Sequence, residues 1–170
     1  MEALQAYITS EYKTADISFS DRKWHIEAEI PNTAGWYFIK TDTPIAVLQK
    51  QKLWQTQYIQ PRNRKTAKVK NYNLSERANR YTKEQSQYWN IIEVYSGLAS
   101  NLQQRAKDHT FADPGTGSLA LSQYPELAQY TWTFHYITLS EFYQGPSEPI
   151  LSLGEQMWRS INGWPILCAE

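Results

Sequence analysis

The pattern of apolar and polar positions predicts short strands separated by helices. Residues 36–40, 91–95 and 131–139 are rich in aromatic and β-branched side chains, which favour an extended backbone. The run 24–30 alternates between apolar and polar residues as a half-buried strand does. With turns at 31–34 and at the glycine and proline positions, this pattern predicts an α+β domain with a small antiparallel sheet flanked by helices.

Helical spacing appears in four further stretches. Residues 2–12, 75–90 and 125–129 have helical composition, and the helix that follows the 91–95 strand carries apolar residues at helical intervals. We expect Gly97 to end that strand and Ser100 or Asn101 to cap the helix. A last helix is expected to open at Leu153, after a turn at 145–149.

Length and composition indicate one folded domain. The chain has 170 residues, no net charge at pH 7, 41% hydrophobic residues and no apolar run long enough to span a membrane. Its beginning lacks the basic and then apolar layout of a secretory signal, so we expect a cytoplasmic protein. One cysteine, Cys168, and three dispersed histidines leave no cysteine-based zinc site. Any bound metal is therefore expected to be hard and held by oxygen atoms.

Charge is strongly segregated along this neutral chain. Residues 49–83 hold ten of the seventeen Lys and Arg residues and one acidic residue, Glu76, so the segment carries 10 − 1 = +9 and the remainder 7 − 16 = −9. Basic patches with interleaved aromatic residues favour a polyanion partner, most simply nucleic acid. The candidate nucleic-acid-binding residues are Arg62, Arg64, Lys65, Lys68, Lys70, Arg77 and Arg80. The alternative is a solvated basic segment, or one neutralised by the acidic remainder.

Arg105 and His109 lie four residues apart, so they share one face of the predicted helix. A guanidinium and an imidazole just beyond the strand-end Tyr95 would suit an anion, most plausibly a phosphate, because the planar fork of arginine engages two oxygen atoms. The alternative is an amphipathic helix whose polar face is solvated.

Two triplets place these residues in a wider pattern. Gly35-Trp36-Tyr37 and Tyr95-Ser96-Gly97, followed by an Asn-Leu-x-x-Arg run that ends at Arg105 and by Glu155, stand in the order typical of one enzyme family. In this order, over about 35–40 and 95–162, the chain resembles the GIY-YIG nuclease family. Trp36 and Ser96 stand where isoleucines are usual, the stretch between the triplets is long, and no asparagine follows Pro165, although Asn162 precedes it.

The resemblance implies a three-stranded antiparallel sheet flanked by helices, with residues 41–90 as a basic insertion that contains the DNA-reading element. It implies a Mg²⁺-dependent endonuclease, with Mn²⁺ as a substitute metal, acting on double-stranded DNA. Tyr37 would be the base or water holder and Tyr95 its companion on the phosphate side. Arg105 would grip the phosphate, His109 would assist, and Glu155 would bind the metal. The short chain favours a site-specific enzyme of restriction type, and both a monomer and a homodimer are open.

Other interpretations of the same residues compete with this one. Tyr37 and Tyr95 are also compatible with ordinary strand tyrosines, Glu155 with a first-turn glutamate that stabilises the helix dipole, and His109 with a surface helix position. The alternatives to an enzyme are a non-catalytic nucleic-acid-binding module of the same fold and a protein-partner-binding domain. A phenol with a pKa near 10 is a poor base at neutral pH, so catalysis by Tyr37 requires Arg105, Lys40 or the metal nearby.

Overall fold

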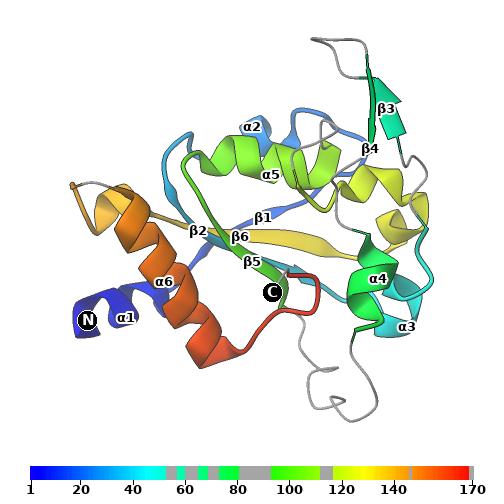
Figure 1. Ribbon diagram of the computed structural model, residues 1–170. Coiled ribbons are helices and arrows are strands. Elements are labelled where there is room, and N and C mark those ends of the chain that lie inside the picture. The colour runs from blue at the N-terminus through cyan, green and yellow to red at the C-terminus, as the bar shows by residue number, and fades with distance from the viewer. Residues whose placement is uncertain are drawn as a thin grey trace.

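The computed structural model describes residues 1–52, 57–59, 65–68, 73–80, 93–111, 117–145 and 147–168. Its main sheet has four antiparallel strands in the order β1-β6-β2-β5 (Figure 1). These strands are β1 (Lys13–Asp16), β6 (Trp132–Thr138), β2 (Gly35–Thr41) and β5 (Glu93–Ala99). A separate hairpin pairs β3 (Gln57–Ile59) with β4 (Thr66–Lys68). The class is therefore α+β, as the sequence predicts.

Helices cover both faces of the main sheet. The α-helices are α1 (Glu2–Ile8), α2 (Trp24–Glu27), α3 (Ile45–Leu48), α4 (Leu74–Ala78), α5 (Leu102–Phe111) and α6 (Ser147–Asn162). The 3₁₀ helices are η2 (Leu121–Gln123), η3 (Pro125–Gln129) and η4 (Leu139–Glu141). In Figure 1, α5 and α6 lie on either side of the end of β5.

Strand β2 divides the core in two because its side chains alternate between the faces of the sheet. Tyr37 and Ile39 belong to a cluster with residues of α5, η2 and η3, whereas Trp36 and Phe38 belong to a second cluster with α1 and α6. All four side chains are buried. The alternation therefore places α5 against the tyrosine side of the sheet and α6 against the other side.

The sequence predicts a sheet of three strands, whereas the main sheet has four. Strand β1 at the edge of the sheet is mostly polar and buries only Ala15, so it lacks the apolar alternation that identifies a strand. The strand expected at 24–30 is also wrong, because Trp24–Glu27 forms the short helix α2. That helix buries the adjacent Trp24 and His25 and leaves Ile26 54% exposed, whereas a half-buried strand would bury alternate residues.

Gly97 does not end the strand, contrary to expectation, since β5 runs on to Ala99. The glycine is needed for close packing instead: a Cβ atom at this position would lie 2.4 Å from the Tyr37 hydroxyl oxygen. Asn101 caps the following helix as expected, with its side-chain oxygen accepting a hydrogen bond from the Gln104 backbone N–H at 2.9 Å.

The last helix begins earlier than predicted. Helix α6 starts at Ser147, so the expected turn at 145–149 partly belongs to the helix, and Pro149 stands in its first turn, where proline is tolerated. Glu155 consequently lies in the middle of α6, and the first-turn interpretation of this residue is wrong.

The basic insertion is described only in part. Within it, Thr66–Lys68 forms strand β4. In the expected helix 75–90, residues 74–78 form α4, with Asn73 as the capping residue, and 81–92 lie outside the described residues.

Candidate functional site

The tyrosines of the two triplets stand next to each other on paired strands. Strands β2 and β5 are antiparallel neighbours, and their register brings the Tyr37 and Tyr95 rings to a stacked arrangement with centroids 6.1 Å apart. Both side chains are buried, with 2% and 5% of their surface exposed. The fold thus brings the two motif tyrosines together on the sheet face that α5 covers.

Arg105 joins these two tyrosines. From the first half of α5 its Nε donates a hydrogen bond to the Tyr37 hydroxyl oxygen at 3.0 Å, and its Nη2 reaches the Tyr95 hydroxyl at 3.4 Å and the carbonyl of Gly117 at 3.3 Å. The planar guanidinium supplies these donors in a fixed geometry, which a lysine would not. Arg105 is therefore held in place by three partners from three different segments.

His109 lies one turn further along α5 and is fully buried. The Leu119 backbone N–H donates to its Nδ1 at 3.3 Å, so in the neutral ring the proton sits on Nε2, which lies 2.8 Å from the Tyr37 hydroxyl oxygen. Burial, reinforced by the nearby Arg105 charge, holds the pKa of His109 well below its usual range and keeps the ring neutral. Within this arrangement His109 contacts Tyr37 and not a ligand at the surface.

The Tyr37 oxygen consequently accepts two hydrogen bonds, from Arg105 Nε and from His109 Nε2. Two donors on one phenol oxygen stabilise negative charge there. Burial nevertheless raises the pKa of Tyr37 to about 12, and Arg105 opposes that rise. The phenol is therefore protonated at neutral pH.

Lys40, the other cation considered for activating Tyr37, lies on the opposite side of the sheet. Its Nζ forms an ion pair with Glu93 at 3.0 Å and stands over the Phe38 ring at 5.4 Å from the centroid. The alternation of β2 puts residues 37 and 40 on different faces. Arg105 alone of the two expected cations contacts the tyrosines.

Glu155 of α6 is partly buried and is already paired. Its Oε1 lies 2.7 Å from Nη2 of Arg159, one turn further along the helix. Burial raises the pKa of the carboxyl, while Arg159 and Arg105 oppose the rise. No group of three or more His, Cys, Asp or Glu side chains able to hold a metal is found in the described part of the chain. Glu155 would be a single-carboxylate ligand, with which Mg²⁺ binds only when waters and a substrate phosphate complete its shell.

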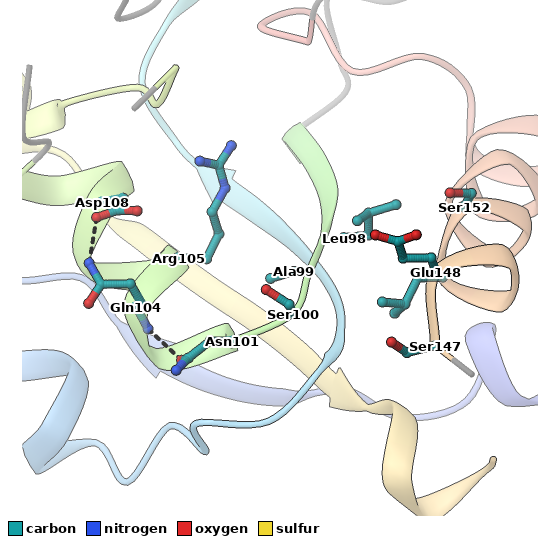
Figure 2. A pocket seen from close by; sticks show the side chains of 11 residues that line it. Leu98, Ala99, Ser100, Asn101, Gln104, Arg105, Asp108, Ser147, Glu148 and Ser152 are labelled. Carbon is teal, nitrogen blue, oxygen red and sulfur yellow. Dashed lines mark hydrogen bonds between the residues drawn. The ribbon is translucent and has the colours of Figure 1, made fainter. Parts of the chain in front are cut away.

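A groove of about 560 Å³ runs between α5 and α6 beside the end of β5. Polar side chains line it from both helices, among them Asn101, Gln104, Asp108, Glu148 and Ser152, together with Arg105. In Figure 2 the Arg105 side chain leaves α5 and extends away from Asn101 and Ser100. Arg105 therefore both lines the groove and belongs to the hydrogen-bonded network with the tyrosines.

The candidate nucleic-acid-binding residues are spread over the insertion. Arg80 and Lys65 are exposed, and Lys68 lies in β4. Arg77 of α4 is half-buried and donates from Nη1 to the carbonyl of Cys168 at 3.2 Å, so it contacts the C-terminal segment. Arg62, Arg64 and Lys70 lie outside the described residues.

Three contributors to the site are absent from the sequence-based prediction. The backbone groups of Gly117 and Leu119 orient Arg105 and His109, and no side-chain pattern reveals a backbone contact. Arg159 was detectable in principle, because it stands four residues after Glu155 on a predicted helix and such pairs meet on one face.

Comparisons with protein-family models, curated proteins and solved structures found no match. Among the described residues, none of the helices has the length and apolar character needed to cross a membrane. The function must therefore be argued from the residues themselves.

Proposed function

We propose that the protein is a Mg²⁺-dependent endonuclease that hydrolyses a phosphodiester bond in double-stranded DNA. The observation that carries the proposal is the convergence of Arg105 Nε and His109 Nε2 on the Tyr37 hydroxyl oxygen, with Arg105 also reaching Tyr95. A partly buried arginine that is held by three partners and borders a groove is suited to an anion whose charge grows during the reaction.

In this proposal the attacking water binds at Tyr37. A pKa of about 12 makes the phenol a group that holds and orients water at neutral pH. Arg105 neutralises the phosphate while the water oxygen bonds to phosphorus and the bond from phosphorus to the ester oxygen breaks. The proton that the water releases passes through solvent to the leaving oxygen. Glu155 would hold the Mg²⁺, with Mn²⁺ as a substitute, and a bound cation would supply further neutralisation of phosphate charge.

The preference for DNA and the restriction-type specificity rest on the basic insertion. Its stretch 49–83 carries a charge of +9 within a neutral chain, which favours a polyanion, and the insertion lies between the two strands that carry the tyrosines. We propose that the insertion follows the DNA backbone and reaches base edges.

A second candidate function is a non-catalytic nucleic-acid-binding module of the same fold. Two observations favour it: the Tyr37 side chain is only 2% exposed, and Oε1 of Glu155 is occupied by Arg159. Trp36 and Ser96 in place of isoleucines agree with this alternative as well.

Incubation with supercoiled plasmid in Mg²⁺ or in EDTA separates the two candidates. The nuclease predicts nicked and linear products in Mg²⁺ only, and Glu155→Ala should abolish them while DNA binding persists. Gln156→Ala, which changes the exposed neighbour of Glu155, is the matched control and should cleave normally. DNA binding without cleavage by the wild type would favour the binding module.

The DNA-reading role of the insertion has its own test. Neutralising Arg62, Arg64 and Lys65 should weaken DNA binding and flatten its salt dependence, because each lost phosphate contact reduces the log–log slope by roughly 0.9. Binding is measured over a salt series with specific and random duplexes. Loss of an arginine that contacts guanine would cost about 1–3 kcal/mol of discrimination at one base position, whereas loss of a phosphate contact weakens all sequences alike. Unchanged affinity and slope would favour a protein partner for this segment.

A further inference from the structure

The two residues that depart from the usual triplets both face α6. Trp36 donates from its indole Nε1 to the Leu151 carbonyl at 2.8 Å, and its ring lies against Gly154, where a Cβ atom would come within 2.4 Å of it. Gly154 immediately precedes Glu155. The tryptophan therefore fixes the turn of α6 from which the carboxylate projects.

Ser96 makes the corresponding contact from β5. It is 1% exposed, and Arg159 of α6 donates to it twice, from Nε to Oγ at 3.1 Å and from Nη2 to the backbone carbonyl at 3.1 Å. An isoleucine would retain the carbonyl acceptor and lose the hydroxyl. The serine thus provides Arg159 with a second acceptor on the strand that carries Tyr95.

Arg159 is anchored independently of Glu155. Besides the two bonds to Ser96, its guanidinium lies 4.3 Å from the centroid of the Trp164 ring, and Nη2 lies 3.5 Å from the Cys168 sulfur. Because these contacts fix the guanidinium, the 2.7 Å ion pair restrains the Glu155 carboxylate and not the reverse.

We propose that Arg159 is a positioning residue for Glu155, an inference that rests on the proposed function of Glu155 as metal ligand. Arg159 holds Oε1 and connects the carboxylate through Ser96 to the strand that carries Tyr95-Ser96-Gly97. The other carboxylate oxygen can then bind a divalent cation at a fixed position relative to the tyrosines. The guanidinium charge opposes a second cation close by. Arg159 therefore lowers the affinity for the metal and raises the rate of the chemical step.

The repulsion between Arg159 and the metal ion predicts a change in metal affinity that a purely structural role would not produce. In Arg159→Met, Mn²⁺ should bind to the free protein about 3-fold or more tightly, since a competing positive charge is removed. At saturating Mn²⁺, kcat for plasmid nicking should fall about 10-fold to 100-fold, because a misoriented ligand displaces the reacting groups, while KM for DNA stays near the wild-type value. Free Mn²⁺ is followed by its electron paramagnetic resonance signal, and Glu155→Gln defines binding that does not involve this carboxylate.

Graded variants and a matched control accompany that experiment. Arg159→Lys keeps the charge and loses the two-pronged grip on Ser96, so it should retain the wild-type Mn²⁺ affinity and show a reduced kcat. Ser96→Ala removes the hydroxyl acceptor alone and should have the smallest effect on kcat. Gln156→Ala should match the wild type in both measurements.

Several outcomes would overturn the inference. Weaker Mn²⁺ binding together with slower cleavage in Arg159→Met would make Arg159 a structural support only, and a wild-type kcat in either Arg159 variant would remove its role in positioning. If Arg159→Met fails to fold, Arg159→Lys decides the question. The nuclease proposal is refuted if the wild type cleaves no DNA. If the wild type in that case still binds Mn²⁺ through Glu155, and more weakly than Arg159→Met does, the inferred pairing of Arg159 with Glu155 stands.

Discussion

Strand β2 presents different chemistry to its two sides, and on each side a histidine contacts one of its aromatic side chains. On the α5 side, His109 binds the hydroxyl oxygen of Tyr37, which also accepts from Arg105. On the α6 side, His135 bonds to the hydroxyl groups of Thr14 and Thr133, each at 2.9 Å, and stacks on Phe38 with ring centroids 4.6 Å apart.

The difference lies in where the donors point. On the α6 side the charged groups neutralise each other, as Lys40 does with Glu93, and the histidine partners are small hydroxyls. On the α5 side a cation and a neutral imidazole both donate to one oxygen, and the side-chain hydrogen bonds of Arg105 within the described residues go to two phenols and a backbone carbonyl. A positive charge partly buried beside phenols is costly for stability alone, and such an arrangement is typical of a functional site.

The largest expected contrast is the removal of one cation from each side. Arg105→Ala should reduce the cleavage rate about 10²-fold or more and DNA affinity much less, because a preorganised charge acts most strongly on the transition state. Lys40→Met removes a cation from the same strand region on the other side and should leave the rate within about 3-fold, since a half-exposed ion pair contributes little. The measurements are single-turnover nicking and equilibrium DNA binding. Equal losses of rate and affinity in Arg105→Ala would make it a positioning contact for DNA.

A pair of hydroxyl deletions tests the same contrast at the level of stability. Tyr37→Phe leaves two buried donors without their acceptor and should cost about 1–3 kcal/mol of unfolding free energy. Tyr12→Phe, next to Phe38 on the α6 side, removes a hydroxyl for which the described residues offer no hydrogen-bond partner, so it should be neutral or stabilising. Urea denaturation of both variants provides the comparison. A stable Tyr37→Phe would show that the convergence on Tyr37 contributes nothing to folding.

The smallest expected effect is a common response of both sides to acid. Burial lowers the pKa of His109 well below its usual range and that of His135 to about 4 from 6.5. Between pH 6.5 and about pH 4, His135 binds a proton in the unfolded chain and remains neutral in the folded protein. The contribution of the neutral histidine to the free energy of unfolding is therefore complete above about pH 6.5 and is lost as the pH falls towards 4. Urea midpoints measured across this range should decline, and His135→Gln should make the decline shallower. Equal slopes in wild type and variant would contradict the assigned role of His135.

The sequence predicts the parts of the fold that have strong local patterns. Strands β2 and β6 and the pairing of Arg105 with His109 on one helix face were expected from aromatic, β-branched and i, i+4 spacing, and the structure confirms them. Strand β1 was missed because a polar edge strand has no apolar period. The prediction that Gly97 ends its strand was wrong because this glycine provides space for the Tyr37 hydroxyl, which the sequence does not reveal.

Within the candidate site, residue types were predictable and partners were not. The sequence singles out Tyr37, Tyr95 and Glu155, whose roles in catalysis stay predictions. It gives no sign that a backbone N–H from Leu119 selects the tautomer of His109, or that Ser96 and Arg159 connect Glu155 to β5. These contacts join segments far apart in the chain, so they depend on tertiary packing.

The C-terminal segment has a consequence for how the sheet ends. Strand β5 stands at an edge of the main sheet, and the Leu167 backbone N–H donates to its Val94 carbonyl at 2.9 Å, while the Cys168 sulfur accepts from the Ser96 N–H at 3.2 Å. Unpaired strand edges are templates on which other chains add strands. By occupying these backbone groups, residues 166–168 protect β5 against edge-to-edge aggregation. These residues lie beside the proposed site, and they also help to prevent polymerisation through the edge of the sheet.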